Sequence, residues 1–313
     1  MTPEAVCQAA HGADRDRISV CVCTYRRPQL LRVLLDALAG QETGDRFDLE
    51  VEVVDNDLGA SSARVVRDAA AGTPLTIWYH HEPVRNISLA RNRAVVHARG
   101  NLVAFIDDDE CPGADWLERL HETLVATGAD GVIAPVVPDF PPEAPRWLRD
   151  GRFLDRRRYR TGTRVESADG RTGNVLLARA LFGEGETWFD PAFGRTGGED
   201  SDFFARQVHN GRVFVWCDEA VVTEAMPPER WTASFHIRRL WRSGTIAGEW
   251  MRTYRRPVAP VVRYAVGLAA CVAVLPATLV LPKYARVRVA QKLAYFAGAI
   301  MAFSGFSLLR HRE

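Results

Sequence analysis

Short apolar runs alternate with amphipathic segments over the first third of the chain. The runs, which predict strands, are residues 18–24, 49–54, 75–79 and 102–106. Between them, apolar residues recur at helical spacing at 30–38, 60–71 and 88–98. This alternation predicts an α/β fold, with a mostly parallel sheet joined by right-handed crossovers and flanked by helices.

Polar residues follow three of these strands at the point where each strand ends. They are Thr24-Tyr25-Arg26-Arg27-Pro28, Asp55-Asn56-Asp57 and Asp107-Asp108-Asp109. Ends of parallel strands share one edge of the sheet, and ligands bind in the crevice there. Two acidic clusters and a basic loop indicate a nucleotide site. The absence of GxGxxG and GxxxxGK[ST] motifs excludes a dinucleotide-binding Rossmann unit and a P-loop, so bound phosphates would need a metal ion.

The string Asp107-Asp108-Asp109-Glu110 places four acidic side chains directly after a strand. Close carboxylates repel by about 4 kcal/mol at an effective dielectric constant of about 20. Two interpretations of this string alone stay open. One is a solvated turn before the helix predicted at 114–127. The other is a site for a hard divalent cation, which prefers oxygen ligands shared with phosphates.

The region 128–225 is less regular and contains a second acidic string. Gly197-Gly198-Glu199-Asp200-Ser201-Asp202 precedes a helical stretch at 203–209. Acidic residues in a first helical turn are favoured by the helix dipole, so on their own they predict only a helix start.

Composition narrows the class of protein. The chain has 313 residues, which suits one large domain or one domain with an appendage, and its net charge of +1 gives no general case for nucleic-acid binding. Six cysteines form no CxxC pair and no zinc spacing with histidine, so a reduced, cytosolic setting is expected. Residues 1–17 lack the apolar core of a signal peptide. A basic region at 228–263 holds eight arginines against two glutamates.

Two segments near the C-terminus, 264–281 and 293–309, contain no charged residue. Each is near the lower limit of about 17 residues for a membrane-spanning helix, and each also suits a core helix. Together, with basic flanks, they favour membrane contact. The connector carries Lys283, Arg286, Arg288 and Lys292. A spanning hairpin would place these charges on the far side, so an interfacial or re-entrant hairpin is favoured.

Several short motifs occur in a fixed order along the chain. They are Ser19 to Arg27, Val53-Val54-Asp55-Asn56, Asn86 to Asn92, Phe105 to Asp109, Thr172-Gly173-Asn174, Phe189-Asp190 and Gly198 to Asp202. The set resembles the inverting glycosyltransferases of family 2, which have a GT-A fold. It is most similar to bacterial enzymes that build exopolysaccharide or lipid-linked glycans. The resemblance covers about residues 17–241 and rests on the whole set, since each motif alone is weak.

The resemblance implies a set of contacts with a nucleoside-diphosphate sugar. Thr24, Tyr25 and Arg26 would line the base pocket, with Tyr25 against the base. The strand-end residues Asp55, Asn56 and Asp57 would lie near the base or ribose, with Asp55 accepting hydrogen bonds from the base. Arg91 would approach the diphosphate or the sugar. A UDP-sugar is favoured as donor, and thymine or guanine nucleotides stay open.

The resemblance also implies the catalytic groups. Asp107, Asp108 and Asp109 occupy the DxD position, where Asp107 would face the ribose or donor sugar. Asp109, with Asp107, would hold Mg²⁺ or Mn²⁺ on the diphosphate. Asp200 matches the catalytic base, with Glu199 beside it. A base is needed because an acceptor hydroxyl is a poor nucleophile until its proton is removed.

The chain departs from the family pattern at two points. Many relatives have a metal-binding histidine where this chain has Glu224. The QxxRW motif of processive synthases is absent, which predicts transfer of one sugar at a time. Arg239 and Arg242 are candidates for contact with the diphosphate or an anionic part of a lipid acceptor, and a basic face against headgroups is an equal alternative.

The acceptor side is predicted around Trp188, Asn174 and Gly198. Aromatic rings stack on sugars, and Trp188 lies between two motifs. A tryptophan is also commonly a core residue.

These observations divide the chain into four parts: a tail at 1–16, a GT-A catalytic domain at 17–225, a basic helical linker at 226–257 and a membrane-associated helical hairpin at 258–313. The expected activity is metal-dependent, inverting transfer of one sugar to a hydroxyl of a glycan or lipid-linked acceptor. We expect it at the cytoplasmic membrane, with the catalytic domain facing the cytosol. A non-catalytic membrane scaffold and a sugar nucleotidyltransferase are the alternatives.

Overall fold

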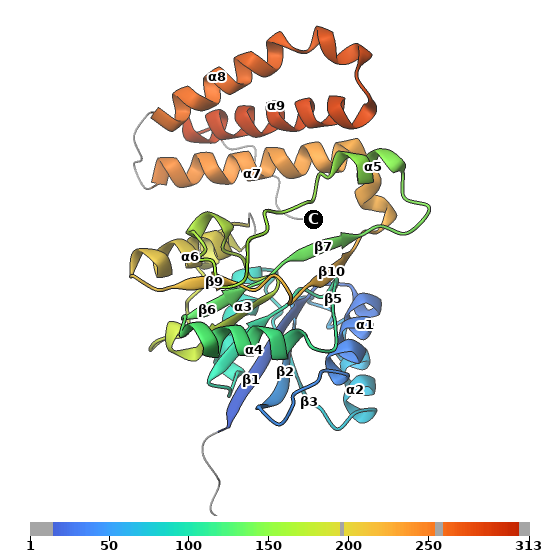
Figure 1. Cartoon of the computed structure of the whole chain (residues 1–313), viewed down its shortest axis with the longest axis vertical. Coiled ribbons are helices and arrows are strands. Elements are labelled where there is room, and N and C mark those ends of the chain that lie inside the picture. The colour runs from blue at the N-terminus through green and yellow to red at the C-terminus, as the bar shows by residue number, and fades with distance from the viewer. Residues whose placement is uncertain (1–14, 195–196, 254–258, 307–313) are drawn as a thin grey trace, which may run out of the picture.

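The structure, a computed structural model, describes residues 15–194, 197–253 and 259–306. The lower part of the molecule in Figure 1 is a sheet with helices on both faces, and the upper part is a layer of three long helices. This architecture, with a large central sheet and flanking helices, confirms the predicted α/β class, but not the apolar C-terminal hairpin that the prediction also included.

Seven strands form the central sheet, in the order β3-β2-β1-β4-β8-β6-β9. They are β1 (Asp16–Thr24), β2 (Phe47–Asp55), β3 (Thr76–His81), β4 (Leu102–Phe105), β6 (Gly131–Ile133), β8 (Val175–Ala178) and β9 (Phe214–Trp216). Strands β1 to β4 are mutually parallel, β8 runs antiparallel to β4 and β6, and β9 is parallel to β6. The sheet is thus mostly parallel, and the four predicted strands are found within two residues of their predicted bounds.

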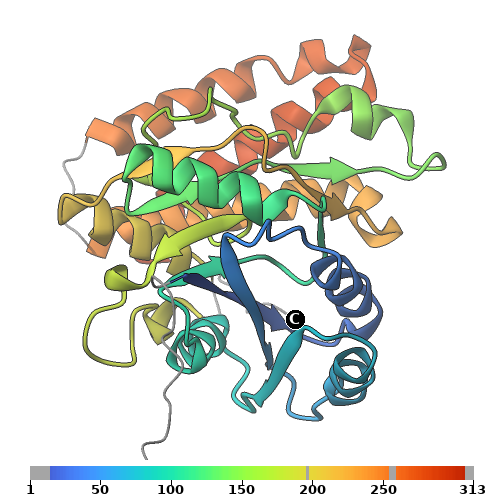
Figure 2. The ribbon, with the colours of Figure 1, turned by 60° about the horizontal axis from the view of Figure 1, so that its bottom comes forward.

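Helices cover both faces of this sheet (Figure 2). Helices α1 (Pro28–Ala39), α2 (Ala63–Ala71) and α4 (Trp116–Thr127) pack on one face, and α3 (Ile87–His97) and α6 (Glu199–His209) on the other. Alternation along β1 follows from the pleat: Val20 and Val22 join the α1 side, while Cys21 joins the α3 side. Each fully buried leucine on α1 contributes roughly 1.5–3 kcal/mol relative to exposure.

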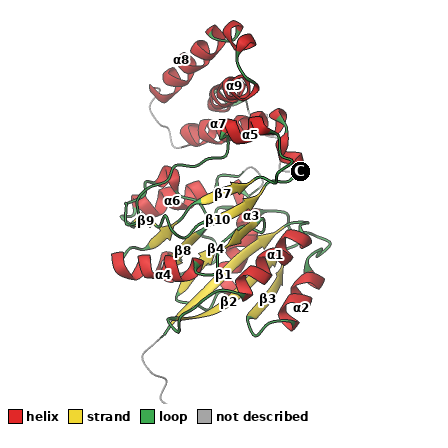
Figure 3. Cartoon of the chain, turned by 45° about the vertical axis from the view of Figure 1, so that its right-hand side comes forward, coloured by secondary structure: helices red, strands yellow, loops and turns green. Residues whose placement is uncertain are grey.

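A smaller sheet brings a late segment of the chain beside the acidic string. It contains β5 (Glu110–Pro112), β10 (Val222–Ala225) and β7 (Val136–Asp139), in that order. Glu224 lies opposite Glu110 in the antiparallel β10–β5 pair. Figure 3 shows β7 and β10 between the central sheet and the helical layer.

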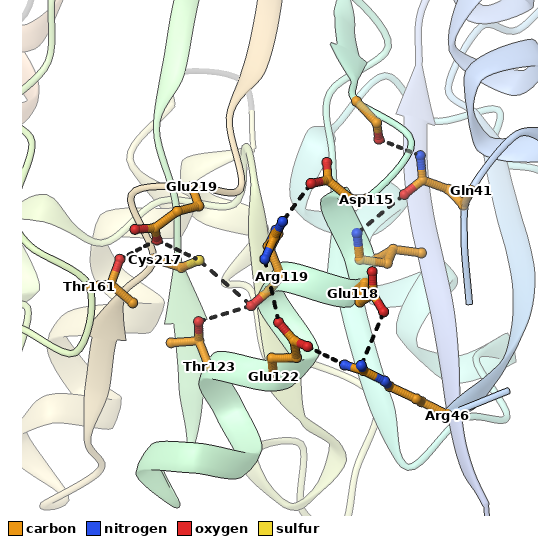
Figure 4. A network of polar contacts seen from close by, with 12 residues as sticks. Gln41, Arg46, Asp115, Glu118, Arg119, Glu122, Thr123, Thr161, Cys217 and Glu219 are labelled. Atoms are coloured by element: carbon orange, nitrogen blue, oxygen red, sulfur yellow. Dashed lines mark hydrogen bonds and ion pairs between the residues drawn. The ribbon is translucent and has the colours of Figure 1, made fainter. Parts of the chain in front are cut away.

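A polar network ties α4, and Gly113 before it, to the segment from Gln41 to Arg46 (Figure 4). Gln41 Nε2 donates to the Gly113 carbonyl at 2.7 Å, and Gln41 Oε1 accepts from the backbone N–H of Leu117 at 3.2 Å. Arg46 pairs with Glu118 and Glu122. Such exposed pairs add little stability one by one, but together they restrict where α4 can lie.

The remaining helical elements are short. They are α5 (Arg146–Gly151) and the 3₁₀ turns Ser167–Asp169, Arg179–Leu181, Pro191–Phe193, Pro228–Trp231 and Pro276–Val280.

The upper layer consists of α7 (Ala233–Thr253), α8 (Ala259–Ala273) and α9 (Lys283–Phe303). Glycines allow α7 and α9 to approach backbone to backbone. A Cβ atom on Gly244 would overlap the Tyr295 carbonyl, and one on Gly298 would lie 2.7 Å from the Trp241 carbonyl. Helices α7 and α9 therefore form one packed unit, although the predicted domain boundary falls between them. That boundary, between 257 and 258, lies outside the described residues.

The predicted hairpin differs in its details. Helices α8 and α9 lie side by side, but the basic connector is not a loop, because Lys283, Arg286, Arg288 and Lys292 all lie within α9. Pro282 precedes this helix, and the residues from Lys283 on suit its first turns. Helices within the described ranges are all too short or too polar to cross a membrane.

Candidate active site

Three loops meet at the carboxyl edge of β1, β2 and β4, as predicted. Thr24 lies opposite Asp55 in the β1–β2 register, and the backbone N–H of Asn56 donates to the Thr24 carbonyl at 2.8 Å. Asp108 joins the third loop to the first, accepting from Thr24 Oγ1 at 2.8 Å and from Arg27 Nη1 at 2.9 Å. The crevice is therefore built by direct contacts between the loops.

The Asp108 side chain joins two loops of the protein and is not placed to contact a ligand. Its side chain is buried, and each of its oxygens is bound within the protein. Burial raises the pKa of Asp108 to about 6, against the lowering effect of Arg27. The predicted donor contact of Asp108 is not supported by this arrangement.

The side chains of Asp55 and Asn56 are also used in hydrogen bonds within the protein. Asp55 is fully buried and accepts from the backbone N–H groups of Asp57 at 3.1 Å and Ser62 at 2.7 Å. Asn56 donates to the carbonyls of Glu82 and Val84 and accepts from the N–H of Asn86. These bonds close the β2 loop and leave Asp55 no exposed oxygen for a base, so its predicted pairing with the base is not supported either.

The accessible side chains at this edge are Tyr25 and Arg26, while Asp57 is buried beneath Arg26. Arg26 Nε donates to Asp57 Oδ1 at 2.8 Å, which links the first loop to the second. The guanidinium of Arg85 lies 4.5 Å from the centre of the Tyr25 ring, and that of Arg26 lies 5.1 Å from it. Both guanidinium groups are within cation–π range of the ring, so a base that stacks on Tyr25 has to share or displace one of them, and the base contact of Tyr25 stays a prediction.

Asp109 is held by two arginines from distant parts of the chain. Arg27 Nη1 donates to Asp109 Oδ2 at 3.0 Å and Arg230 Nη2 donates to the same oxygen at 2.6 Å. Arg230 Nη1 donates to Glu224 at 2.6 Å. Arg27 and Arg230 are site residues beyond the predicted set, and the only sequence signal for Arg230 is its place in the basic region.

The residues present fit a divalent cation that arrives with a diphosphate. Within the described ranges, His, Cys, Asp and Glu form no preassembled cluster of three ligands. Magnesium sites of this kind use one or two carboxylates and complete their shell with phosphate oxygens and water. Asp109 and Glu224 supply that number, since one guanidinium spans both, and Asp107 is half exposed nearby.

The buried guanidinium group of Arg91 connects the acidic string to α6. Arg91, on α3, pairs through Nη1 with Glu199, and its Nη2 lies 3.8 Å from Asp107. Burial alone would lower the pKa of Arg91, but Glu199, Asp107 and Asp200 raise it above its ordinary value. Arg91 therefore stays charged between the two halves of the site.

Glu199 and Asp200 have different environments. Glu199 is buried against Arg91, whereas Asp200 is partly exposed in the first turn of α6. Asp200 Oδ1 accepts from the N–H of Ser201 at 2.7 Å, which orients its carboxylate. Of the two carboxylates, Asp200 is the more accessible, and Glu199 is engaged by Arg91, so the role of Asp200 as the base stays a prediction.

The predicted acceptor residues lie in three different environments. Asn174 is fully buried, accepts from Trp116 Nε1 at 2.7 Å and donates to two backbone carbonyls, so all of its amide is used internally. Trp188 packs edge-on against Phe182, as a core residue does. Gly198, at φ 102°, precedes α6 and faces Ile246 of α7. The geometry argues against Asn174 as an acceptor contact; for Trp188 and Gly198 this contact stays a prediction.

A group of arginines lies on the α7 side of Asp200. Burial lowers the pKa of Arg171 to about 10, and Arg156 and Arg239 add to that shift. Burial also lowers the pKa of Arg239, helped by Arg156, Arg230 and Arg242. These cations are near enough to disfavour one another's charge.

The fold and the crevice define a GT-A type of glycosyltransferase. The model of glycosyl transferase family 2 matches residues 19–182. Succinoglycan biosynthesis protein ExoM of Rhizobium meliloti is 38% identical over 231 residues, 74% of each chain. The chain belongs to glycosyltransferase family 2, which confirms the resemblance and the predicted enzyme class.

The chain is also similar to a further curated protein and to solved structures. Chondroitin synthase of Escherichia coli is 24% identical over 68% of this chain and 35% of its own length. The mannosyltransferase PcManGT of Pyrobaculum calidifontis, solved with GDP-Man and Mn²⁺, has a TM-score of 0.62 at 21% identity, covering 96% of this chain and 90% of its own. S. aureus TarS residues 1–349 has a TM-score of 0.52 at 16% identity, covering 92% of each chain.

Proposed function

We propose that this glycosyltransferase moves one sugar from a nucleoside-diphosphate sugar to a hydroxyl of a glycan or lipid-linked acceptor, with inversion, using Mg²⁺ or Mn²⁺. The observation that carries the proposal is the chain of charges from Asp107 through Arg91 to Glu199, directly beside Asp200. It ties the donor side of the crevice to a partly exposed carboxylate, which is the arrangement a single displacement needs.

In the proposed reaction, the acceptor hydroxyl oxygen attacks C1 of the donor sugar and its proton passes to Asp200. The bond from C1 to the phosphate oxygen breaks, and its electron pair leaves with the nucleoside diphosphate. Asp200 takes the proton because it is oriented by Ser201 and accessible. Arg91 holds Glu199 in an ion pair, so that α6 presents Asp200 rather than Glu199 to the crevice.

A bound divalent cation would stabilise the charge that develops on the leaving diphosphate. Asp109 would hold it, with Asp107 and Glu224 as the nearest further carboxylates. The solved neighbour PcManGT contains Mn²⁺, which supports testing this ion first.

The nucleotide of the donor has to be determined by comparing UDP- and GDP-sugars. UDP-sugars remain the favoured donors, and one TarS structure contains UDP, but PcManGT is in complex with GDP-Man. Because Asp55 is buried, it gives no preference between them. A thermal-shift screen of UDP- and GDP-sugars with and without Mn²⁺ tests the proposal, since a bound donor raises Tm according to its occupancy. No Mn²⁺-dependent shift with any donor would contradict it, and an Asp109→Asn variant should lose the shift seen in the wild type.

We also propose that the upper helical layer lies on the cytoplasmic face of a membrane, with the catalytic part in the cytosol. The 3₁₀ turn after α8 exposes Leu279 by 79% and Val280 by 88%, and α8 exposes Val266 by 64%. Apolar side chains beside basic ones suit the interface of an anionic bilayer.

Vesicle sedimentation tests this location. The wild type should sediment with vesicles containing anionic lipid, and Leu279→Asp with Val280→Asp should reduce the bound fraction severalfold. Leu58→Asp is the matched control, because Leu58 is 76% exposed on the catalytic part. Equal binding by wild type and the double variant would contradict the proposed surface.

A further inference from the structure

Three arginines with few carboxylate contacts gather beyond Asp200. Arg239 stands on α7, Arg156 follows α5, and Arg171 precedes β8. Within the described ranges, neither Arg156 nor Arg239 has a side-chain hydrogen bond or ion pair. Arg171 donates from Nε to the backbone carbonyl of Asp169 at 3.1 Å, and the Asp169 carboxylate lies 4.0 Å from its Nη2. Other arginines of the same region do have partners: Arg158 pairs with Asp218 at 2.8 Å and Arg230 with Asp109.

Packing explains why these arginines meet. The Phe153 and His236 rings lie 5.2 Å apart, which fixes the segment after α5 on α7. Arg156 and Arg239 each come three residues later, and on α7 that spacing keeps Arg239 on the face of His236. The electrostatic influence of Arg156 and Arg239 on Arg171 shows that all three share one region.

The same region borders the reacting centre. Asp200 acts electrostatically on Arg171. Two residues after Arg171, Gly173 approaches the acidic string so closely that its Cβ would lie 3.3 Å from Asp107 Oδ2. The three arginines therefore line the α7 side of the crevice, on the way from Asp200 to the apolar helical layer.

A protein gains nothing in stability from holding like charges together in a half-buried place, and such groups mark functional sites. Guanidinium groups bind phosphate through paired, charge-assisted hydrogen bonds. A phosphate or diphosphate group balances three positive charges better than a single carboxylate group would.

We infer that Arg156, Arg171 and Arg239 form a subsite for a phosphate or diphosphate group of the acceptor. This inference rests on the proposed function and adds to it the chemical class of the acceptor. A donor diphosphate is the other source of such a group. The acceptor is favoured because Asp107 and Asp109 already mark the donor side, while this subsite lies beyond the base and beside the layer that would meet the membrane. An acceptor sugar linked through phosphate to a lipid would pass this point.

Binding of two probes separates the sources. Dodecyl phosphate, below its micelle concentration, stands for the acceptor group, and UDP with Mn²⁺ stands for the donor group. Arg239→Gln and Arg156→Gln should each weaken dodecyl phosphate binding about tenfold, as loss of a charge-assisted hydrogen bond predicts, and leave the Kd for UDP within about twofold. Arg238→Gln is the control, because Arg238 is the exposed neighbour on α7. Dodecyl glucoside controls for the alkyl chain.

Stability gives a second readout. Since the arginines repel one another, Arg239→Gln and Arg156→Gln should keep or raise Tm, whereas a structural role predicts a fall in Tm. The inference is overturned if the variants weaken UDP instead, if dodecyl phosphate binding is unchanged, if Arg238→Gln has the same effect, or if Tm falls in both variants. Failure of the proposed function would look different: the wild type would transfer no sugar from any nucleotide donor, whatever its affinity for dodecyl phosphate.

Discussion

Arg230 and Asp109 are joined by a hydrogen bond of 2.6 Å, from Nη2 to Oδ2, and the other terminal nitrogen of Arg230 donates to Glu224 at 2.6 Å. One guanidinium thus stands between the carboxylate predicted to hold the metal and the carboxylate that takes the place of the family's histidine. A cation that binds Asp109 has to compete with Arg230 or shift it.

This competition predicts the effect of Arg230→Gln on metal affinity. Without a donor, the variant should bind Mn²⁺ about tenfold more tightly than the wild type, because a charge-assisted contact to Asp109 is gone. Titration followed by the electron paramagnetic resonance signal of free Mn²⁺ measures this. Arg238→Gln should match the wild type. Equal or weaker Mn²⁺ binding by Arg230→Gln would show that the guanidinium does not compete.

Substitutions of the adjacent residues Glu199 and Asp200 should affect different properties of the protein. Asp200→Asn should lower kcat by a factor of roughly 10² to 10⁴ while the donor Kd stays within about twofold, because only the proton acceptor is lost. Single-turnover transfer and donor titration give the two values. Full turnover by this variant would remove Asp200 as the base.

Glu199→Gln should lower the stability of the folded protein. It leaves the buried Arg91 without its main counter-charge, and breaking a buried pair costs about 3–5 kcal/mol. Urea denaturation should show a lower free energy of unfolding for Glu199→Gln and little change for Asp200→Asn. The reverse order would mean that the two carboxylates have exchanged roles.

The comparison of Asp55 with Asp57 shows how far the sequence could predict the site. Apolar runs and the geometry of parallel strands are enough to place both residues at the carboxyl edge. They do not decide which partner each carboxylate takes. Both are buried, but Asp55 accepts from the backbone N–H of Ser62, seven residues further on, whereas Asp57 accepts from the exposed side chain of Arg26. The sequence therefore predicts the edge of the site but not the orientation of each side chain.

Asn174 and Arg230 show two other limits. Asn174 adopts a positive φ of 59° and turns its amide inward, which residue type alone does not indicate. Arg230 reaches Asp109 across 121 positions, through the pairing of β10 with β5. Neither contact has a local pattern, because both arise from how distant elements pack.

Asp108 predicts a pH dependence of stability. Its pKa is raised in the folded protein to about 6 from an ordinary value of 3.8, mainly by burial. The folded state therefore binds more protons than the unfolded state between these values, and the free energy of unfolding falls as pH rises from about 4 to 6. The contribution of this one group is about 3 kcal/mol. Asp108→Asn should remove this part of the slope, and urea titrations of both proteins across that range measure it. Parallel curves would contradict the assignment.

The contact of Gly244 with Tyr295 predicts how the upper layer responds to added volume. A methyl group at Gly244 would meet the Tyr295 carbonyl, which belongs to the backbone of α9 and has no rotamer to change. Gly244→Ala should therefore push α7 from α9 and lower the free energy of unfolding by about 1–3 kcal/mol, although alanine favours an isolated helix by about 1 kcal/mol. Gly183→Ala is the control, since a Cβ at Gly183 has no neighbour within 4 Å. Hydrogen exchange should locate the loss of protection in α7 and α9, with the central sheet unchanged. A variant as stable as the wild type would mean that the two helices can separate freely, and the arginines carried by α7 would then not be held beside Asp200.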